Sequence, residues 1–140
     1  MDLTQWRDQL TPCLTGVLAE LPVSPDEIAM LVLDLHPWEG HLELCLLTRD
    51  EARQDPALRS VEESAAWQHF AFSEELVSWA PTAALAARMR ADYEQAGQKA
   101  VVGRAYFEAC AEAMAQAYAG LKFPILLSHP DDGEVFFRSP

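Results

Sequence analysis

Positive charge is scarce in this sequence. Ten Lys and Arg residues stand against 22 Asp and Glu residues, which gives a formal net charge of −12 at pH 7. A surface of this sign repels nucleic acid and anionic lipid, and it attracts a partner with a basic face. The acidic residues are spread along the chain with no acidic tail, so folding must assemble any acidic patch. We therefore expect no nucleic-acid partner and a protein partner with a basic face.

Cysteines and long apolar runs are also rare. Cys13, Cys45 and Cys110 lie far apart and are odd in number, so they form no disulfide framework and no CxxC metal pair. The longest uncharged stretch, residues 76–87, contains Pro81, and the opening residues MDLTQWRDQL do not resemble a secretory signal. We expect a cytoplasmic protein with no membrane partner.

The short motifs of common enzymes are missing. The sequence contains no GxGxxG, no Walker-type loop, no HExxH, no GxSxG and no basic aromatic stripe. No cofactor and no catalytic residue are therefore expected. The chain also lacks a fixed-period repeat and a Gly/Ser-rich linker, which predicts one domain over residues 1–140.

Hydrophobic spacing defines the N-terminal elements. Apolar residues three and four apart predict a helix from Leu3 to Leu21, with a kink or restart where Pro12 follows Thr11. Residues 28–35 and 41–48 are apolar or alternating, and they predict an antiparallel hairpin. A rival interpretation makes Ser24-x-x-Glu27 a capping box and turns residues 28–35 into a helix.

The pattern of the second half of the chain predicts helices followed by strands. Thr48-x-x-Glu51 and Ser60-x-x-Glu63 are capping-box patterns that predict two short helices. Longer helices are predicted over residues 82–95 and 98–119, and "PILLSH" and "EVFFRS" predict a second hairpin joined by "PDDG". The sequence thus predicts an α+β fold. Its antiparallel sheet would come from an N-terminal-half hairpin and a C-terminal hairpin, packed by the N-terminal helix and two longer helices.

The segment HPWEGH, residues 36–41, admits three interpretations. Pro37 and Gly40 favour a tight turn at a hairpin tip. An exposed Trp38 there, beside Glu39, would anchor a partner. Alternatively His36 and His41 could ligate zinc, but a complete site would need further ligands such as His69 or His129.

Two other segments carry candidate chemistry. In "SHPDDGEV", Gly133 favours a turn, while Asp131, Asp132 and Glu134 could form an acidic contact surface. Cys45 shares an alternating strand face with His41, which would suit a thiolate–imidazole pair, although no oxyanion hole is evident and a packed thiol is the simpler interpretation.

The order of these segments along the chain resembles that of known domain families. The hairpin "MLVLDLHPWEGHLELCLLTRDE", the aromatic "AAWQHFAF" and the closing "FPILLSHPDDGEVFF" resemble in layout small bacterial domain families, several of which belong to or lie near polymorphic-toxin immunity systems. The resemblance implies a binding protein rather than an enzyme, and the most concrete form of this expectation is an immunity-type protein that occludes a basic toxin or nuclease. It transfers no active-site residue.

We therefore predict an acidic protein-binding module whose contact residues are Trp38, Glu39, Asp131, Asp132 and Glu134. One alternative is a metal-binding protein or enzyme centred on His36 and His41. Another is a homo-oligomer, such as a homodimer, in which the alanine-rich helix bearing Val102, Tyr106 and Ala109 forms the interface.

Overall fold

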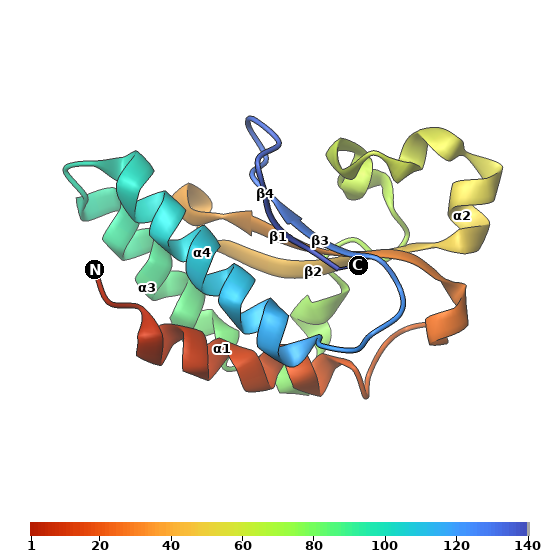
Figure 1. The fold of residues 1–140 in the computed structure, drawn as a ribbon, viewed down its shortest axis with the longest axis horizontal. Coiled ribbons are helices and arrows are strands. Elements are labelled where there is room, and N and C mark those ends of the chain that lie inside the picture. Colours follow the sequence, from red (N-terminus) through yellow and green to blue (C-terminus); the bar gives the residue numbers. More distant parts are fainter. Residues whose placement is uncertain (140) are drawn as a thin grey trace.

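The computed structural model describes residues 1–139, which form an α+β fold as predicted (Figure 1). Four α-helices and four strands are joined by short 3₁₀ turns, η1 to η6. Their bounds are α1 Thr4–Val17, β1 Ile28–His36, β2 His41–Thr48, α2 Arg49–Gln54, α3 Thr82–Gln95, α4 Lys99–Ala117, β3 Ile125–Ser128 and β4 Val135–Arg138. The turns are η1 Pro25–Glu27, η2 Pro37–Glu39, η3 Pro56–Arg59, η4 Val61–Ala66, η5 Phe72–Glu75 and η6 Val77–Trp79.

The four strands form one sheet in the order β2-β1-β3-β4. Both predicted hairpins are present, because β1 pairs antiparallel with β2 and β3 pairs antiparallel with β4. The prediction of a purely antiparallel sheet is wrong, since β1 and β3 run parallel with Leu31 opposite Ile125. A parallel neighbour requires a long crossover connection, and here β2, α3 and α4 lie between the two strands in the chain. The helical interpretation of residues 28–35 is also wrong.

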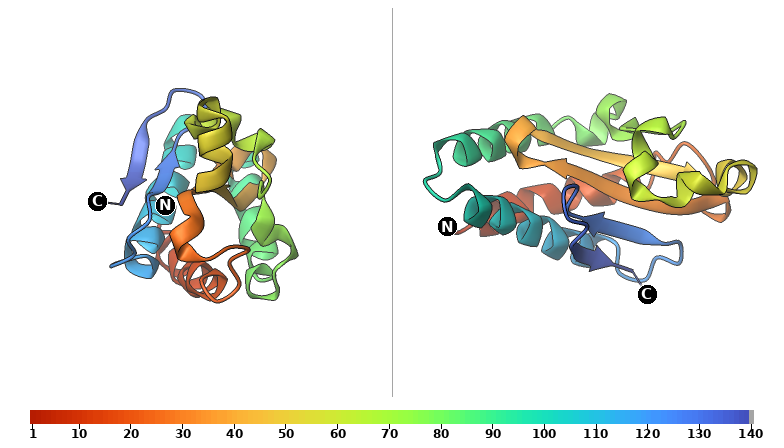
Figure 2. Two further views of the ribbon diagram at one scale, coloured as in Figure 1. Left: turned by 90° about the vertical axis from the view of Figure 1, so that its right-hand side faces the viewer. Right: turned by 90° about the horizontal axis from the view of Figure 1, so that it is seen from above.

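Strand alternation gives the sheet two different faces. Leu31, Leu33 and Leu35 of β1 face the same side as Leu42 and its even-numbered neighbours of β2, and all of them belong to the main core. Helices α1, α3 and α4 cover this side (Figures 1 and 2). The sheet therefore packs its leucines against helices, as expected for an α+β fold.

Helix α1 is continuous, with Pro12 inside it, so the chain does not restart there. Buried hydrogen bonds join the helices: Trp6 Nε1 donates to the Leu85 carbonyl at 3.0 Å, and the Tyr118 hydroxyl donates to the Leu14 carbonyl at 3.1 Å. Tyr106 and Ala109 of α4 lie in this core, so that face of the helix is not free to contact a second copy. No helix within residues 1–139 has the length and apolarity needed to cross a membrane.

The opposite face of the sheet is only partly covered. A smaller core joins Val32, Cys45 and Leu47 of the sheet to Ala52 of α2 and to Trp67. Thr48 and Glu51 form the predicted capping box of α2. Ser60 makes no side-chain cap, and the second predicted short helix is the 3₁₀ turn η4 instead. These elements cover the Leu47 end of the hairpin, while the His36 end carries polar side chains on this face.

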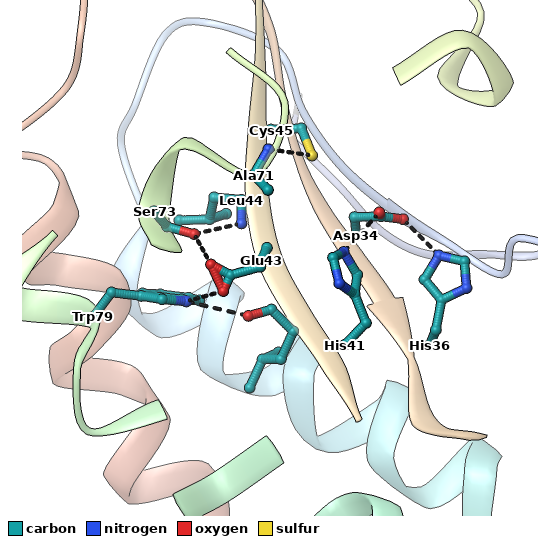
Figure 3. A network of polar contacts seen from close by, with 10 residues as sticks. Asp34, His36, His41, Glu43, Leu44, Cys45, Ala71, Ser73 and Trp79 are labelled. Carbon is teal, nitrogen blue, oxygen red and sulfur yellow. Dashed lines mark hydrogen bonds and ion pairs between the residues drawn. The ribbon is translucent and has the colours of Figure 1, made fainter. Parts of the chain in front are cut away.

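The outer edge of β2 is closed by residues 69–79 (Figure 3). The Leu46 amide donates to the His69 carbonyl at 3.2 Å, and the Leu44 amide donates to Ser73 Oγ at 2.8 Å. Trp79 Nε1 donates to the Leu42 carbonyl at 3.1 Å. An open strand edge would invite pairing with other chains, so these bonds protect β2 from aggregation.

Ser73 provides the clearest test of this edge, because its side chain is fully buried and forms hydrogen bonds with two partners. Its hydroxyl accepts from Leu44 N–H and donates to Glu43 at 3.0 Å. Replacing Ser73 with Ala leaves both groups without this partner and should lower the free energy of unfolding by about 1–3 kcal/mol. Urea denaturation measures the change. The exposed Ser60→Ala is the matched control, and an equal loss in both variants would contradict this role of Ser73.

Candidate functional site

HPWEGH forms the tip of the first hairpin, as the turn interpretation predicted. Pro37–Glu39 make the 3₁₀ turn η2, closed by a bond from the Gly40 amide to the Pro37 carbonyl at 3.3 Å. Gly40 has a left-handed φ of 66°, and a Cβ there would lie 3.1 Å from Arg90 Cβ of α3. Both the backbone conformation and the close approach to α3 therefore require glycine.

Trp38 is half-buried in this turn. Its ring centroid lies 5.3 Å from His36, 6.2 Å from Tyr93 of α3 and 5.9 Å from His129 of the β3–β4 loop. The indole thus holds the hairpin tip against α3 and the second hairpin, and its role in binding a partner stays a prediction.

Strand register brings Asp34, His36 and His41 together on the partly covered face. His36 lies directly opposite His41 across the hairpin, and Asp34 precedes His36 by two residues on the same face. His36 Nε2 lies 2.9 Å from Asp34 Oδ1, and His41 Nε2 lies 3.0 Å from Asp34 Oδ2 (Figure 3). One carboxylate therefore binds two imidazoles, one through each oxygen. We call these three residues the imidazole–carboxylate cluster.

The cluster shifts the titration of its own members. Burial raises the pKa of Asp34, but the hydrogen bonds from His36 and His41 outweigh it and hold that pKa well below its ordinary value. The hydrogen bond to Asp34 raises the pKa of His36 against an opposing effect of burial, with smaller contributions from Glu39 and Asp131. A neutral imidazole that donates through Nε2 keeps Nδ1 as an acceptor. Asp34 thus fixes the orientation and the tautomer of its neighbours.

The cluster lies in a cleft of about 660 Å³ between two walls. One wall is η4 with Phe70, and the other is the loop between β3 and β4, residues 128–133. Both stand on the same side of the sheet in Figure 1. Its carboxylates are Asp34, Glu39, Glu62, Asp131 and Asp132, and its imidazoles are His36, His41 and His129. No Lys or Arg from residues 1–139 lines it. We call this space the acidic cleft.

The β3–β4 loop places His129 at the rim. His129 Nδ1 accepts a hydrogen bond from the Asp131 amide at 3.1 Å, and its ring stacks on Phe107 with centroids 4.9 Å apart. The loop closes through Gly133, which has φ 75° and donates its amide to the His129 carbonyl at 2.9 Å. This confirms the turn predicted for PDDG.

Four of the five predicted contact residues gather at this end of the molecule. Glu39, Asp131 and Asp132 are exposed and line the acidic cleft, and Trp38 lies beside it against His129. Glu134 does not line it. Its carboxylate makes a two-fold contact with Arg104, at 3.1 and 2.7 Å, which neutralises its charge.

Phe70 provides an exposed aromatic ring in the cleft. Its side chain is 39% exposed and stacks on His41 with ring centroids 6.2 Å apart and planes 12° from parallel. The next residue, Ala71, has a left-handed φ of 52°, which is strained for a residue with a Cβ. Its amide donates to Cys45 Sγ at 3.3 Å, and this contact holds the turn that presents Phe70.

Cys45 is unsuited to nucleophilic chemistry. The side chain is fully buried, and burial raises the pKa of its thiol to about 12. A nucleophilic cysteine requires a lowered pKa and access to solvent. The packed-thiol interpretation therefore holds for Cys45, and burial raises the pKa of Cys110 in the same way.

Glu43 belongs to the strand edge rather than to the cleft. It lies opposite Asp34 in the register, but its carboxylate turns toward Ser73 and Trp79, at 3.0 Å from each (Figure 3). Burial raises its pKa, against the opposing effect of these two hydrogen bonds. Glu43 therefore fixes residues 73–79 in place and leaves Asp34 to the histidines.

The two histidines proposed as metal ligands do lie together, with ring centroids 5.4 Å apart. Asp34 already occupies the Nε2 side of each ring. Within residues 1–139, no group of three or more His, Cys, Asp or Glu residues has an arrangement that could hold a metal ion. His69, the fourth histidine, pairs by its backbone with Leu46 and does not line the cleft.

Comparison of the chain with protein-family models, with curated proteins and with solved structures gives no match.

Asp34 should couple stability to pH through His36. Because the pKa of His36 is raised above 6.5, its contact stabilises the fold fully below pH 6.5 and is lost as the pH rises through the folded-state pKa. Asp34→Asn should lower the free energy of unfolding at pH 6 by about 1–2 kcal/mol and flatten this decline. For Asp34 itself the pH dependence of stability has the opposite sign, because its pKa is lowered in the folded state. Its contribution to the free energy of unfolding is lost only as the pH falls below 3.8, the ordinary pKa of an aspartate.

Chemical denaturation between about pH 5 and pH 8.5 tests this coupling. The exposed Asp26→Asn, at the other end of β1, is the control and should run parallel to the unmodified protein. If the free energy of unfolding of Asp34→Asn shows the same pH dependence above pH 6 as that of the unmodified protein, the imidazole–carboxylate cluster does not couple stability to pH.

Proposed function

We propose that this chain is a cytoplasmic binding protein that holds a basic segment of a partner protein in the acidic cleft. The observation that carries the proposal is the lining of the cleft, which contains carboxylates and imidazoles but, among residues 1–139, neither Lys nor Arg. A cationic side chain entering there meets negative charge on the sheet, on η4 and on the β3–β4 loop.

The apolar part of the lining favours a long basic side chain over a small cation. Val61, Ala65 and the exposed ring of Phe70 lie in the same cleft as the carboxylates. The methylene stem of Arg or Lys packs on such groups while its charged end reaches the acids. An arginine can also stack its flat guanidinium on the Phe70 ring.

The net charge of −12 supports a further role in association. A field of one sign speeds the encounter with a partner of opposite sign. An immunity protein that occludes a basic toxin is the most concrete form of this proposal, and it rests on the resemblance in layout. Glu39, Asp131 and Asp132 are its principal contact residues.

Removing charge from the cleft rim should weaken binding of a basic probe. A fluorescent hexa-arginine peptide serves as the probe, and its Kd is measured by anisotropy at pH 7.5. Asp131→Asn combined with Asp132→Asn should raise the Kd about fivefold, because each exposed ion pair contributes up to about 1 kcal/mol.

The matched control removes the same charge elsewhere. Asp26 and Glu27 are exposed in η1, at the opposite end of β1 from the cleft. Asp26→Asn combined with Glu27→Gln should change the Kd by less than about twofold. Equal losses in the two double variants would mean that the peptide binds the overall charge of the protein, and the proposal would be wrong.

Salt should act mainly on the rate of association. Raising NaCl from about 0.05 M to about 0.5 M shortens the screening length and should slow hexa-arginine association about tenfold, with a smaller change in dissociation. Stopped-flow fluorescence separates the two rates. An association rate that ignores ionic strength would contradict electrostatic steering.

A further inference from the structure

Three of the four histidines in the sequence line the acidic cleft. His36 and His41 come from the first hairpin, and His129 comes from the loop of the second. Every other ionisable group in the lining is a carboxylate. The imidazoles are therefore the groups through which the cleft itself can gain positive charge.

The charged groups around these histidines come from every wall. Asp34 lies on β1, Glu39 on η2, Glu62 on η4, and Asp131 and Asp132 on the β3–β4 loop. Glu43 lies beside His41 on β2 but faces Ser73 and Trp79. The cations of the neighbouring helices do not line the cleft. Arg90 of α3 pairs with Glu94 at 2.9 Å, and Arg104 of α4 pairs with Glu134. Lys99 of α4 shares a second pocket with His129, Asp131 and Asp132, and its ammonium donates to the Tyr93 and Glu94 carbonyls at 2.9 Å.

The hydrogen bonds at the rings depend on protonation. His129 Nδ1 accepts from the Asp131 amide, which requires an unprotonated nitrogen at that position. His36 and His41 each present Nε2 to one oxygen of the same carboxylate, so their full protonation places two positive charges on one Asp34. Protonation thus changes both the charge of the cleft and the contact that shapes its rim.

We propose that these three histidines make the acidic cleft a proton-gated site for a basic side chain. The cleft holds an arginine of the partner while the imidazoles are neutral and releases it when they are protonated. This inference rests on the proposed function. It adds that the partner would be held at neutral pH and released on acidification.

Linkage sets the size of the effect. Protons and the basic ligand compete for the same negative potential, so each proton that must leave on binding changes the affinity by up to about tenfold per pH unit. Histidine titrates in this range, whereas arginine stays charged throughout it. A change in affinity therefore reports on the protein and not on the probe.

The test measures the Kd of the hexa-arginine peptide at pH 7.5 and at pH 5.5 under constant ionic strength. The unmodified protein should bind about tenfold more weakly at pH 5.5. His36→Gln and His129→Gln should each reduce this ratio. His69→Gln removes the one histidine outside the cleft and should leave the ratio unchanged.

A second measurement uses the unmodified protein and so does not depend on how the variants fold. Adding saturating peptide should lower the NMR titration midpoints of the His36, His41 and His129 rings and leave that of His69 in place. Equal Kd values at the two pH values, or midpoints that do not move when the peptide binds, would overturn the gate alone. Failure of the peptide to bind at either pH would overturn the proposed function and the gate together.

Discussion

The structure depends on the position of β1 at the centre of a mixed sheet. This strand pairs with β2 on one side and with β3 on the other, and its side chains alternate between two unlike surroundings. Leu31, Leu33 and Leu35 enter the helical core, while Val32, Asp34 and His36 face the other way. A one-residue shift in the register of β1 would move these leucines out of the core, so the core fixes which side chains face the cleft.

The same strand assembles the acidic cleft from distant parts of the chain. Antiparallel pairing with β2 places His41 opposite His36, and parallel pairing with β3 carries His129 and Asp131 to the neighbouring rim. Residues 61–70 close the remaining side, where the turn at Ala71 presents Phe70. A dispersed set of acids thereby becomes a local concentration of negative charge.

Much of this architecture could be predicted from short-range patterns. Short apolar or alternating runs joined by turn residues predicted both hairpins, Pro37 and Gly40 marked the first turn, and the bounds of α3 followed from its apolar spacing. The parallel β1–β3 pairing could not be read in this way, because it depends on how the helices return the chain to the sheet. Ser60 resembled a helix cap, yet η4 packs as a 3₁₀ turn over the small core around Trp67.

The candidate site was predicted in part. Glu39, Asp131 and Asp132 were named from their loops, whereas Asp34 was not singled out within the strand predicted over residues 28–35. Asp34 could have been linked to His36 from the sequence, because residues two apart on a strand lie on the same face. His129 comes close to His36 only through the parallel pairing of β1 with β3. The grouping of these histidines in one cleft could therefore be seen only in the tertiary structure.

The central claim is that the acidic cleft, and not the general negative surface, binds basic segments of a partner. Chemical-shift mapping of the ¹⁵N-labelled protein with hexa-arginine at pH 7.5 tests this most directly. We expect the largest shifts in residues 34–41, 61–70 and 128–133. Shifts spread evenly over exposed acids such as Asp26, Glu27 and Glu112, or gathered along α3, would contradict this claim.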